Sequence, residues 1–358
     1  MFKNKFIPAV FLLLCTTPSY SQKFIPCTDK DITYEGRIAF TPTAAELMWP
    51  GTSVTIHFKG TGISGEFKDQ DTSNYYNVIV DQVPVRVIQF DTAKKWVTLA
   101  SGLPYGKHSL QLFKRTEWDK GKTWFYGIAT AGKTRLLKPA RLPKRKIEFF
   151  GNSITCGYAI YDKQKDFPFG YYENNYDAYA AITARHYKAQ YHCTAKSGIG
   201  IMVSWFPLIM PEMYNRLDPA DSTSKWDFSK YIPDVVVINL FQNDSWIVTM
   251  PQNEQFKNRF GSKPPSEAKI VASYKNFVQT IRSVYPKAQI ICMLGNMDIT
   301  KKGSPWPAYV EKAVAEINDP KIFTYIAPYK DTYGHPKAEE QQQLADGLIH
   351  FIDHHIKW

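Results

Sequence analysis

The sequence contains few cysteines, and their spacing lacks the usual patterns of a metal site. Only five of the 358 residues are cysteine, and no Cys-x-x-Cys pair or regular Cys/His spacing occurs. Zinc sites built from cysteine and histidine usually show such spacings. The sequence therefore predicts chemistry without a metal or other cofactor. Cys193 and Cys292 lie in apolar, strand-like runs and are predicted to be buried free thiols.

The chain also lacks a long apolar segment after its first residues. Two lysines precede a short apolar run over residues 6–14, and small residues follow at Ser19 and Ser21. This layout predicts a secretory signal peptide over residues 1–21, because the run is too short for a permanent membrane helix. A lipoprotein anchored at Cys15 is less favoured, since a bulky leucine precedes that cysteine. We expect an exported protein, periplasmic or secreted, with no integral membrane segment after cleavage.

Acidic residues are in the minority, with 33 Asp and Glu against 44 Lys and Arg. A basic balance can indicate nucleic-acid binding. Here the basic residues are scattered, and the one dense run covers residues 138–146. We interpret the charge as a solvated surface and the dense run as a linker, so no nucleic-acid partner is expected.

The pattern of apolar and polar residues changes near that linker. Residues 22–140 contain short alternating runs separated by turn residues and no segment with helical periodicity, which predicts an antiparallel β-sandwich. In residues 145–358 apolar runs alternate with segments of helical periodicity, which predicts an α/β domain with a parallel sheet. The predicted strands cover 53–58, 76–80, 85–90, 96–99, 108–113, 147–150, 191–195, 234–240 and 289–294, and the helices cover 178–187, 273–284, 307–317 and 338–352.

A serine follows the first predicted strand of the second part. Residues 149–157 read FFGNSITCG, so a buried strand ends, a glycine permits a tight turn, and Ser153 comes next. Active sites of α/β sheets gather beyond the carboxyl ends of the strands, and an N–H at a helix start can face a developing oxyanion. Taken alone, this serine would more often be a helix N-cap.

Other residues suited to catalysis also follow strands or precede a helix. Asn243 and Asp244 come after an apolar run; the amide could donate to an oxyanion and the carboxylate could brace the loop, although an Asx turn is the plain alternative. Gly198 and Gly200 follow another strand, where a glycine N–H could approach substrate. His335 precedes the last helix and is suited to accept a serine proton near neutral pH.

In this order the four signals match the four blocks of the SGNH (GDSL-type) hydrolases, which the second part of the chain resembles. The resemblance implies a flavodoxin-like three-layer α/β/α fold around a parallel sheet, with Ser153 as nucleophile and His335 as base. It also implies an oxyanion hole formed by the N–H of Ser153, an N–H from Gly198 or Gly200, and the side chain of Asn243. Between the two glycines we favour Gly200.

The first part of the chain contains several short motifs that narrow the resemblance. They are Gly36-Arg37, Trp49-Pro50-Gly51, Phe58-Lys59-Gly60-Thr61, Leu103-Pro104 through His108 and Lys114-Arg115-Thr116-Glu117, together with Ser153-Ile154-Thr155-Cys156-Gly157-Tyr158 in the second part. These motifs resemble carbohydrate esterase family 2, whose members carry a jelly-roll domain before the catalytic domain. That resemblance implies an esterase that removes O-acetyl groups from carbohydrates, often at the 6-position of gluco- or mannopyranosyl units. The substrate would be an acetylated hemicellulose or oligosaccharide.

Three positions depart from the pattern of the superfamily. Asn152 stands where aspartate is usual, and Phe241 stands where glycine is usual, either narrowing the acyl pocket or filling space under its loop. Thr332 occupies the position three residues before the histidine, where the triad aspartate is usual. We therefore expect a Ser-His dyad whose histidine is oriented by a backbone carbonyl, with Asp331 as the second candidate for this role.

Two tryptophans are candidates for contact with a sugar. Trp205 and Trp246 lie just beyond the second and third blocks and could flank the cleft, although core packing is an equally good interpretation. Two rival functions stay open at this point: an SGNH lipase or thioesterase acting on longer acyl chains, and a non-catalytic glycan-binding protein whose hydrolase site has decayed.

Overall fold

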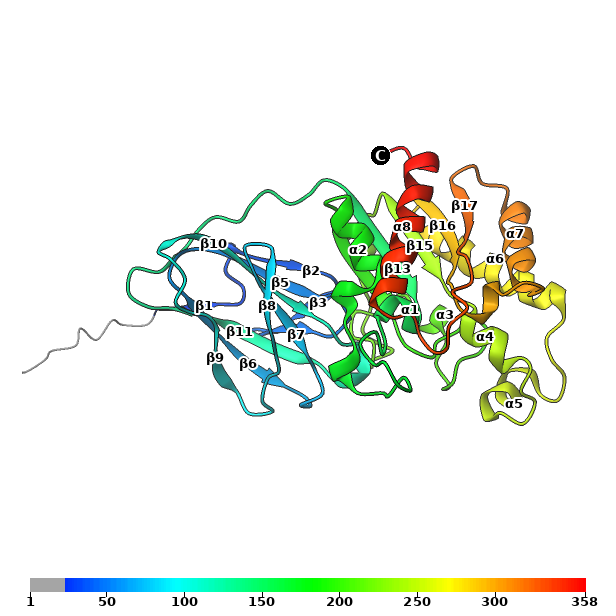
Figure 1. Ribbon diagram of the computed structural model, residues 1–358, viewed down its shortest axis with the longest axis horizontal. Helices are drawn as coiled ribbons and strands as arrows, with labels where there is room; N and C mark the ends of the chain where they lie inside the picture. Colours follow the sequence, from blue (N-terminus) through cyan, green and yellow to red (C-terminus); the bar gives the residue numbers. More distant parts are fainter. Residues whose placement is uncertain (1–22) are drawn as a thin grey trace, which may run out of the picture.

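The computed structural model describes residues 23–358, so the predicted signal peptide and Cys15 lie outside the described residues. Figure 1 shows a β part and an α/β part side by side, joined by a linker that passes above the β part. None of the helices in residues 23–358 is long and apolar enough to cross a membrane. The four cysteines of this range are buried free thiols, which confirms the prediction for Cys193 and Cys292.

The β part consists of two six-stranded antiparallel sheets that share one core. One sheet has the order β3-β4-β11-β6-β9, with β1 also paired to β11, and the other has the order β12-β5-β10-β7-β8, with β2 also paired to β5. Alternate residues of β5 and β10 meet those of β6 and β11 in the shared core. The predicted β-sandwich is confirmed. Its strands are β1 (Lys23–Pro26), β2 (Ile32–Glu35), β3 (Ile38–Phe40), β4 (Ala45–Leu47), β5 (Ser53–Gly60), β6 (Ile63–Asp69), β7 (Tyr76–Val80), β8 (Val83–Ile88), β9 (Lys95–Ala100), β10 (Gly106–Lys114), β11 (Thr123–Thr130) and β12 (Arg135–Leu136).

The α/β part is a five-stranded parallel sheet of order β14-β13-β15-β16-β17 with helices on both faces. Alternate residues of its central strands pack against α2 and α8 on one face and against α6 and α7 on the other, so the predicted three-layer sandwich is confirmed. Its elements are β13 (Lys146–Gly151), α1 (Ser153–Cys156), α2 (Tyr179–His186), β14 (Gln190–Ala195), α3 (Met210–Met213), β15 (Val235–Asn239), α4 (Gln242–Ile247), α5 (Glu254–Phe260), α6 (Glu267–Val284), β16 (Gln289–Leu294), α7 (Trp306–Ile317), β17 (Ile322–Ile326) and α8 (Ala338–His355).

The two parts share buried contacts and do not merely adjoin. Met48 and Trp49 of the β part belong to the same apolar cluster as the helices α6 and α7. Trp49 also donates its indole N–H to the carbonyl oxygen of Leu217 at 2.8 Å. A buried ion pair joins Arg37 of the β part to Glu148 on β13, with 2.8 Å between Nη2 and Oε1. The loops of the β part are therefore held in fixed positions beside the carboxyl ends of the parallel strands.

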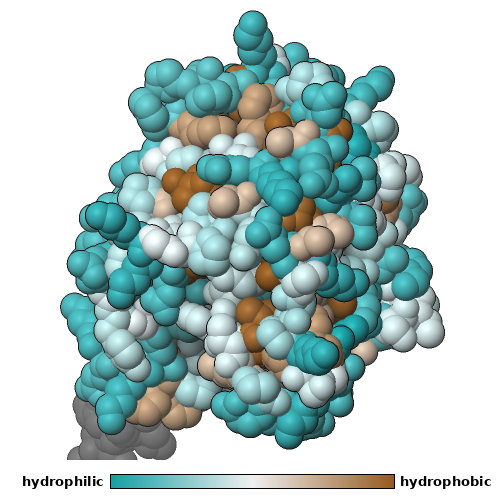
Figure 2. All heavy atoms as spheres, turned by 90° about the vertical axis from the view of Figure 1, so that its right-hand side faces the viewer, coloured by the Kyte–Doolittle hydropathy of each residue, from teal (hydrophilic) through white to brown (hydrophobic). Residues whose placement is uncertain are grey.

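The outer surface of the α/β part is mostly hydrophilic. Figure 2 views the molecule from that end and shows hydrophobic residues only in small, separate patches. No continuous apolar face is visible there, which agrees with the interpretation of the scattered charges as a solvated surface.

Candidate active site

Ser153 is presented by a sharp turn between β13 and α1. A Cβ atom on Gly151 would lie 2.0 Å from the Thr155 hydroxyl oxygen, so only glycine fits where the strand turns into the helix. The helix is capped by Asn152, whose Oδ1 accepts the N–H of Ile154 at 3.1 Å. Because Asn152 performs the capping, the hydroxyl of Ser153 is left free for another partner.

That partner is His335, which lies in the loop before α8. Its Nε2 is 2.8 Å from the Oγ of Ser153. The ring of Tyr158 packs against the imidazole with 4.8 Å between centroids, which limits the orientations open to it. The structure thus brings together the two residues that the sequence predicted as nucleophile and base.

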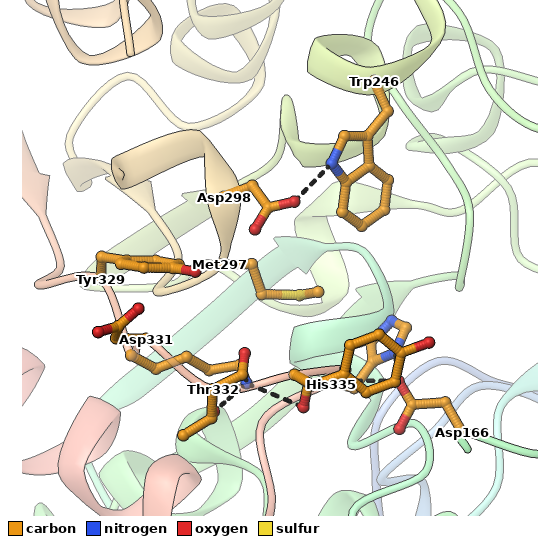
Figure 3. Close-up of a pocket in the computed structure, with 11 residues that line it drawn as sticks. Asp166, Trp246, Met297, Asp298, Tyr329, Asp331, Thr332 and His335 are labelled. Carbon is orange, nitrogen blue, oxygen red and sulfur yellow. Dashed lines mark hydrogen bonds and ion pairs between the residues drawn. The ribbon is translucent and has the colours of Figure 1, made fainter. Parts of the chain in front are cut away.

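The other ring nitrogen of His335 contacts a residue that the sequence analysis missed. Nδ1 lies 2.8 Å from Oδ2 of Asp166, and the same oxygen accepts the backbone N–H of His335 at 2.6 Å. Because a carboxylate only accepts, Nδ1 carries the proton and Nε2 is free to accept the Ser153 hydroxyl. Asp166 therefore corrects both expectations: neither a backbone carbonyl nor Asp331 orients the histidine. Figure 3 shows Asp166 beside His335 and Asp331 across the pocket.

Asp166 is held as an anion by its surroundings. Burial alone would raise the pKa of this carboxyl group, but the hydrogen bonds from His335 and Lys337 outweigh burial and keep its pKa well below the usual range. The Nζ atom of Lys337 is 2.6 Å from Oδ1 of Asp166. Asp166 is thus ionised at neutral pH and can stabilise a positive charge that forms on the imidazole.

The position of Asp166 is fixed by a tight turn that begins at Asp162. Asp162 is almost fully buried, and its carboxylate accepts the N–H groups of Gln164 at 2.8 Å and Phe167 at 2.6 Å. Asp166 itself has a left-handed φ of 58°. These features turn the chain back on itself, so that a residue 13 positions after the serine points at His335.

Three residues beside the Ser153 hydroxyl have N–H groups that are available to donate a hydrogen bond. Ser153 is the first residue of α1, so its N–H has no partner within that helix. The N–H of Gly198 makes no hydrogen bond with any of the residues 23–358. The side-chain amide of Asn243 donates one hydrogen to the carbonyl oxygen of Ile199 at 2.8 Å, which leaves its second hydrogen available. All three residues line one cavity of about 340 Å³ together with His335.

The expected preference for Gly200 over Gly198 is wrong. The N–H of Gly200 donates to the hydroxyl of Ser204 at 2.9 Å and is therefore already used. Gly200 also lies against the Asp244 carboxylate, away from the cavity that holds Ser153. Of the two glycines, Gly198 is therefore the one that lines the cavity and whose N–H has no partner among residues 23–358.

Asp244 braces the same loop, as the sequence suggested. Its buried carboxylate accepts the N–H groups of Ile201, Met202 and Val203 at 2.7 to 3.1 Å. Phe241 fills space beneath the loop and does not narrow the cavity, since its buried ring packs between Tyr274 and Trp306. Its φ of 78° explains why glycine is common at this position.

Both predicted tryptophans line the active-site cavity. Trp205 is 44 % exposed and donates its indole N–H to Oδ1 of Asn243 at 3.1 Å. Trp246 donates to Asp298 at 3.2 Å, as Figure 3 shows. A second cavity of about 500 Å³ adjoins the first, because Trp246 and His335 line both. The cavity that holds Ser153 is thus continuous with a second one, and together they form a longer cleft.

The β part contributes a buried carboxyl group to the site. Glu117, in the loop between β10 and β11, is fully buried, and its Oε2 accepts the N–H of Ser197 at 2.7 Å. It therefore holds the residue directly before Gly198. Burial and two neighbouring carboxylates raise the pKa of Glu117 to about 8, although two lysines oppose the shift.

This raised pKa predicts a pH-dependent stability. A carboxyl group with a higher pKa in the folded chain than its ordinary 4.5 stabilises the fold below that ordinary value and loses this contribution as pH rises through about 8. We expect the Tm of the protein to fall between pH 5 and pH 8, and Glu117→Gln to flatten this fall. Asp119, Glu173, Lys120 and Lys196 surround Glu117 in both proteins. Equal slopes of Tm against pH in the two proteins would contradict the prediction.

This arrangement of strand-end blocks around a serine and a histidine defines the class of the protein as a GDSL-like hydrolase. The GDSL-like Lipase/Acylhydrolase family model matches residues 149–353, and the carbohydrate esterase 2 N-terminal model matches residues 34–139. The chain belongs to carbohydrate esterase family 2, which confirms the resemblance found in the sequence.

Relatives with known names support the same assignment. The chain is 35 % identical over 342 residues to cellulase/esterase CelE of Acetivibrio thermocellus, covering 91 % of this chain but only 40 % of that much longer protein. It is 29 % identical over 327 residues to an acetylxylan esterase / glucomannan deacetylase of Cellvibrio japonicus, covering 86 % of this chain and 85 % of the relative. A family two carbohydrate esterase from Clostridium thermocellum, solved in complex with cellohexaose, superposes with a TM-score of 0.79 at 35 % identity, covering 90 % and 98 % of the two chains.

Proposed function

We propose that this protein is a serine esterase that removes O-acetyl groups from carbohydrates. The main support is the hydrogen-bonded series Ser153, His335 and Asp166. Its serine and histidine line a cavity that is also lined by Trp205 and Trp246. Membership of carbohydrate esterase family 2 supports the substrate class, as do relatives named acetylxylan esterase / glucomannan deacetylase. The substrate would be an acetylated hemicellulose or oligosaccharide.

The mechanism follows from the positions of these groups. His335 accepts the Ser153 proton as the hydroxyl oxygen attacks the acetyl carbonyl carbon. The N–H groups of Ser153 and Gly198 and the amide of Asn243 then stabilise the tetrahedral oxyanion, and one such donor commonly contributes about 3 kcal/mol. His335 returns the proton to the departing sugar oxygen, which leaves an acetyl group on Ser153. A water molecule, deprotonated by His335, then attacks the carbonyl carbon of the acetyl-serine. The bond from that carbon to the Ser153 oxygen breaks, His335 returns the proton to this oxygen, and acetate is released.

Asp166 keeps the imidazole in the tautomer that this sequence of steps requires. It also stabilises the imidazolium formed in each half-reaction, while Lys337 balances its negative charge. The two tryptophans suit the faces of a sugar, because an indole offers a broad apolar face. Both of their N–H groups are occupied by Asn243 and Asp298, so their rings are fixed before substrate arrives.

The wider organisation is part of the same proposal. We propose a β-sandwich domain over residues 22–140, a catalytic domain over residues 145–358, and export directed by residues 1–21. The division is supported by the sheet order, and export is supported by the signal-peptide layout of the sequence.

The proposal is tested by acetate release from acetylated mannan, xylan and glucomannan, with Ser153→Ala as the inactive control. We expect release with at least one polymer, and covalent labelling of Ser153 by a fluorophosphonate in the wild-type protein alone. A clear preference for p-nitrophenyl octanoate over the acetate ester would instead support a lipase-like enzyme. Binding of the polymers without labelling or acetate release would support a glycan-binding protein with a decayed site.

A further inference from the structure

A cluster of exposed aromatic side chains lies beside the active site and has no role in the chemistry described above. Phe167, Phe169 and Tyr171 lie in the connection between α1 and α2, and 38 %, 60 % and 61 % of these residues are exposed. Exposed aromatic residues that are adjacent in space commonly mark a binding surface. The cluster lies on the loop that carries Asp166.

The rings of this cluster support one another. Phe167 and Phe169 stack with 5.9 Å between centroids and 24° between their planes. Tyr171 makes edge contacts with Tyr172 at 5.4 Å and with Tyr75 of the β part at 5.9 Å. We call these five residues the aromatic ledge: Phe167, Phe169, Tyr171, Tyr172 and Tyr75.

The main chain beneath the ledge is anchored to the β part. A Cβ atom on Gly170 would lie 2.2 Å from the carbonyl oxygen of Ser73, so the two segments are in close contact. Arg115 donates from Nε to the carbonyl oxygen of Glu173 at 3.1 Å and from Nη2 to that of Tyr171 at 3.4 Å. A surface fixed in this way loses little conformational freedom when it binds a ligand.

The segment that carries the ledge reaches the active-site cavity at one residue. Pro168, between the two stacked phenylalanines, lines the cavity that contains Ser153. A ligand that fills this cavity and extends past Pro168 would meet the ledge next. The rings lie in the open with tyrosine hydroxyls beside them, which suits a sugar, with its apolar face and polar edge, better than an acyl chain.

We propose that the aromatic ledge binds sugar units of an extended glycan chain next to the acetylated unit that is held over Ser153. The proposal rests on the proposed function, since it assumes that the acetylated unit is a sugar. If the proposal is right, the enzyme prefers polymeric over monomeric substrates because of contacts with a surface outside the catalytic cavity.

The test compares one acetylated monosaccharide with an acetylated hexasaccharide of the same sugar. The wild-type protein should have the higher kcat/KM on the hexasaccharide. The double variant Phe169→Ala, Tyr171→Ala should lower the ratio of the two kcat/KM values about tenfold, which corresponds to about 1.4 kcal/mol. The loss should appear in KM on the hexasaccharide, because the variant removes two aromatic contacts with the sugar chain. A ratio equal to that of the wild-type protein would overturn the proposal.

A matched control is available at the far end of the β part. Phe24 is 51 % exposed and packs edge-on against Trp96, 6.0 Å away. Phe24→Ala should leave the substrate ratio at its wild-type value, and an equal loss in this variant would also overturn the proposal.

Failure of the ledge can be distinguished from failure of the proposed function. Acetate released with an unaltered ratio in the double variant counts against the ledge alone. If the wild-type protein releases no acetate from either substrate, the esterase proposal fails, and calorimetric titration with the unacetylated hexasaccharide decides about the ledge. Weaker binding by the double variant than by the wild-type protein would then support the ledge, and equal binding would overturn it.

Discussion

Replacing Asp166 with asparagine should lower kcat about 10⁴-fold, the scale found when the aspartate of a serine-hydrolase triad is replaced in this way. Asparagine has nearly the same shape, but its amide can donate to Nδ1 and so favours the tautomer that carries the proton on Nε2. In that tautomer His335 cannot accept the proton of Ser153. Steady-state hydrolysis of p-nitrophenyl acetate measures the loss, and KM should change far less than kcat.

Asp331→Asn provides the matched control. Asp331 has a left-handed φ of 50°, which asparagine tolerates, and its side chain makes no hydrogen bond with any residue of the range 23–358. We expect this variant to keep kcat within about threefold of wild type, since no contact with the reacting groups is lost. If Asp331→Asn lost as much activity as Asp166→Asn, or if Asp166→Asn kept nearly full activity, the assignment of Asp166 would be wrong.

The residues that the sequence located are those attached to regular elements. Ser153 and Asn243 follow buried strands and His335 precedes a long helix, so a parallel sheet necessarily brings them to one edge. Asp166 has no such link to the sheet. It lies in a loop without periodicity, and its position depends on the Asp162 turn and on its own left-handed backbone, which the sequence does not reveal. The choice between Gly198 and Gly200 likewise depends on one hydrogen bond to Ser204.

The fold shows the same division between periodic and irregular signals. The strands β13, β14, β15 and β16 are buried along almost their whole length, and each was predicted to within about one residue of its observed bounds. The edge strand β17 was missed, because only its first residue is buried and its sequence carries no clear period. The helix α6 begins six residues earlier than predicted, where Ser266 caps it by accepting the N–H of Lys269.

The contact between the two parts depends on the buried charge of Arg37. The sequence showed this residue only as part of a family motif and did not reveal its role. Arg37 is 1 % exposed and donates to the carbonyl oxygens of Tyr214 and Arg216 at 2.6 and 2.9 Å, besides pairing with Glu148. Four aromatic rings lie 5.5 to 5.9 Å from its guanidinium carbon, so water cannot replace these partners. Glu148 is also fully buried and accepts hydrogen bonds from Thr194 and Tyr285.

Arg37→Met should therefore lower the free energy of unfolding by about 3–5 kcal/mol, because it leaves the carboxylate of Glu148 buried without its cation. The double variant Arg37→Met, Glu148→Gln should recover part of this loss, since glutamine is neutral. Its amide oxygen can accept from one of the two hydroxyl groups of Thr194 and Tyr285, and its NH2 group can donate to the other. Urea unfolding followed by tryptophan fluorescence measures the four proteins of this cycle, and we expect a coupling energy of about 1–3 kcal/mol.

An exposed ion pair serves as the control that shows how much of the effect of Arg37→Met is due to burial and not to the loss of an ion pair as such. Lys275 and Glu316 join α6 to α7 at 3.1 Å, with side chains 30 % and 42 % exposed. Lys275→Met should cost less than about 1 kcal/mol, because water solvates the remaining carboxylate. If Arg37→Met cost no more than Lys275→Met, the buried pair would not stabilise the contact between the parts. The loops bearing Glu117 and Tyr75 would then be held beside the active site by the other contacts between the parts, such as the apolar contacts of Met48 and Trp49 and the hydrogen bonds from Arg115 to Glu173 and Tyr171.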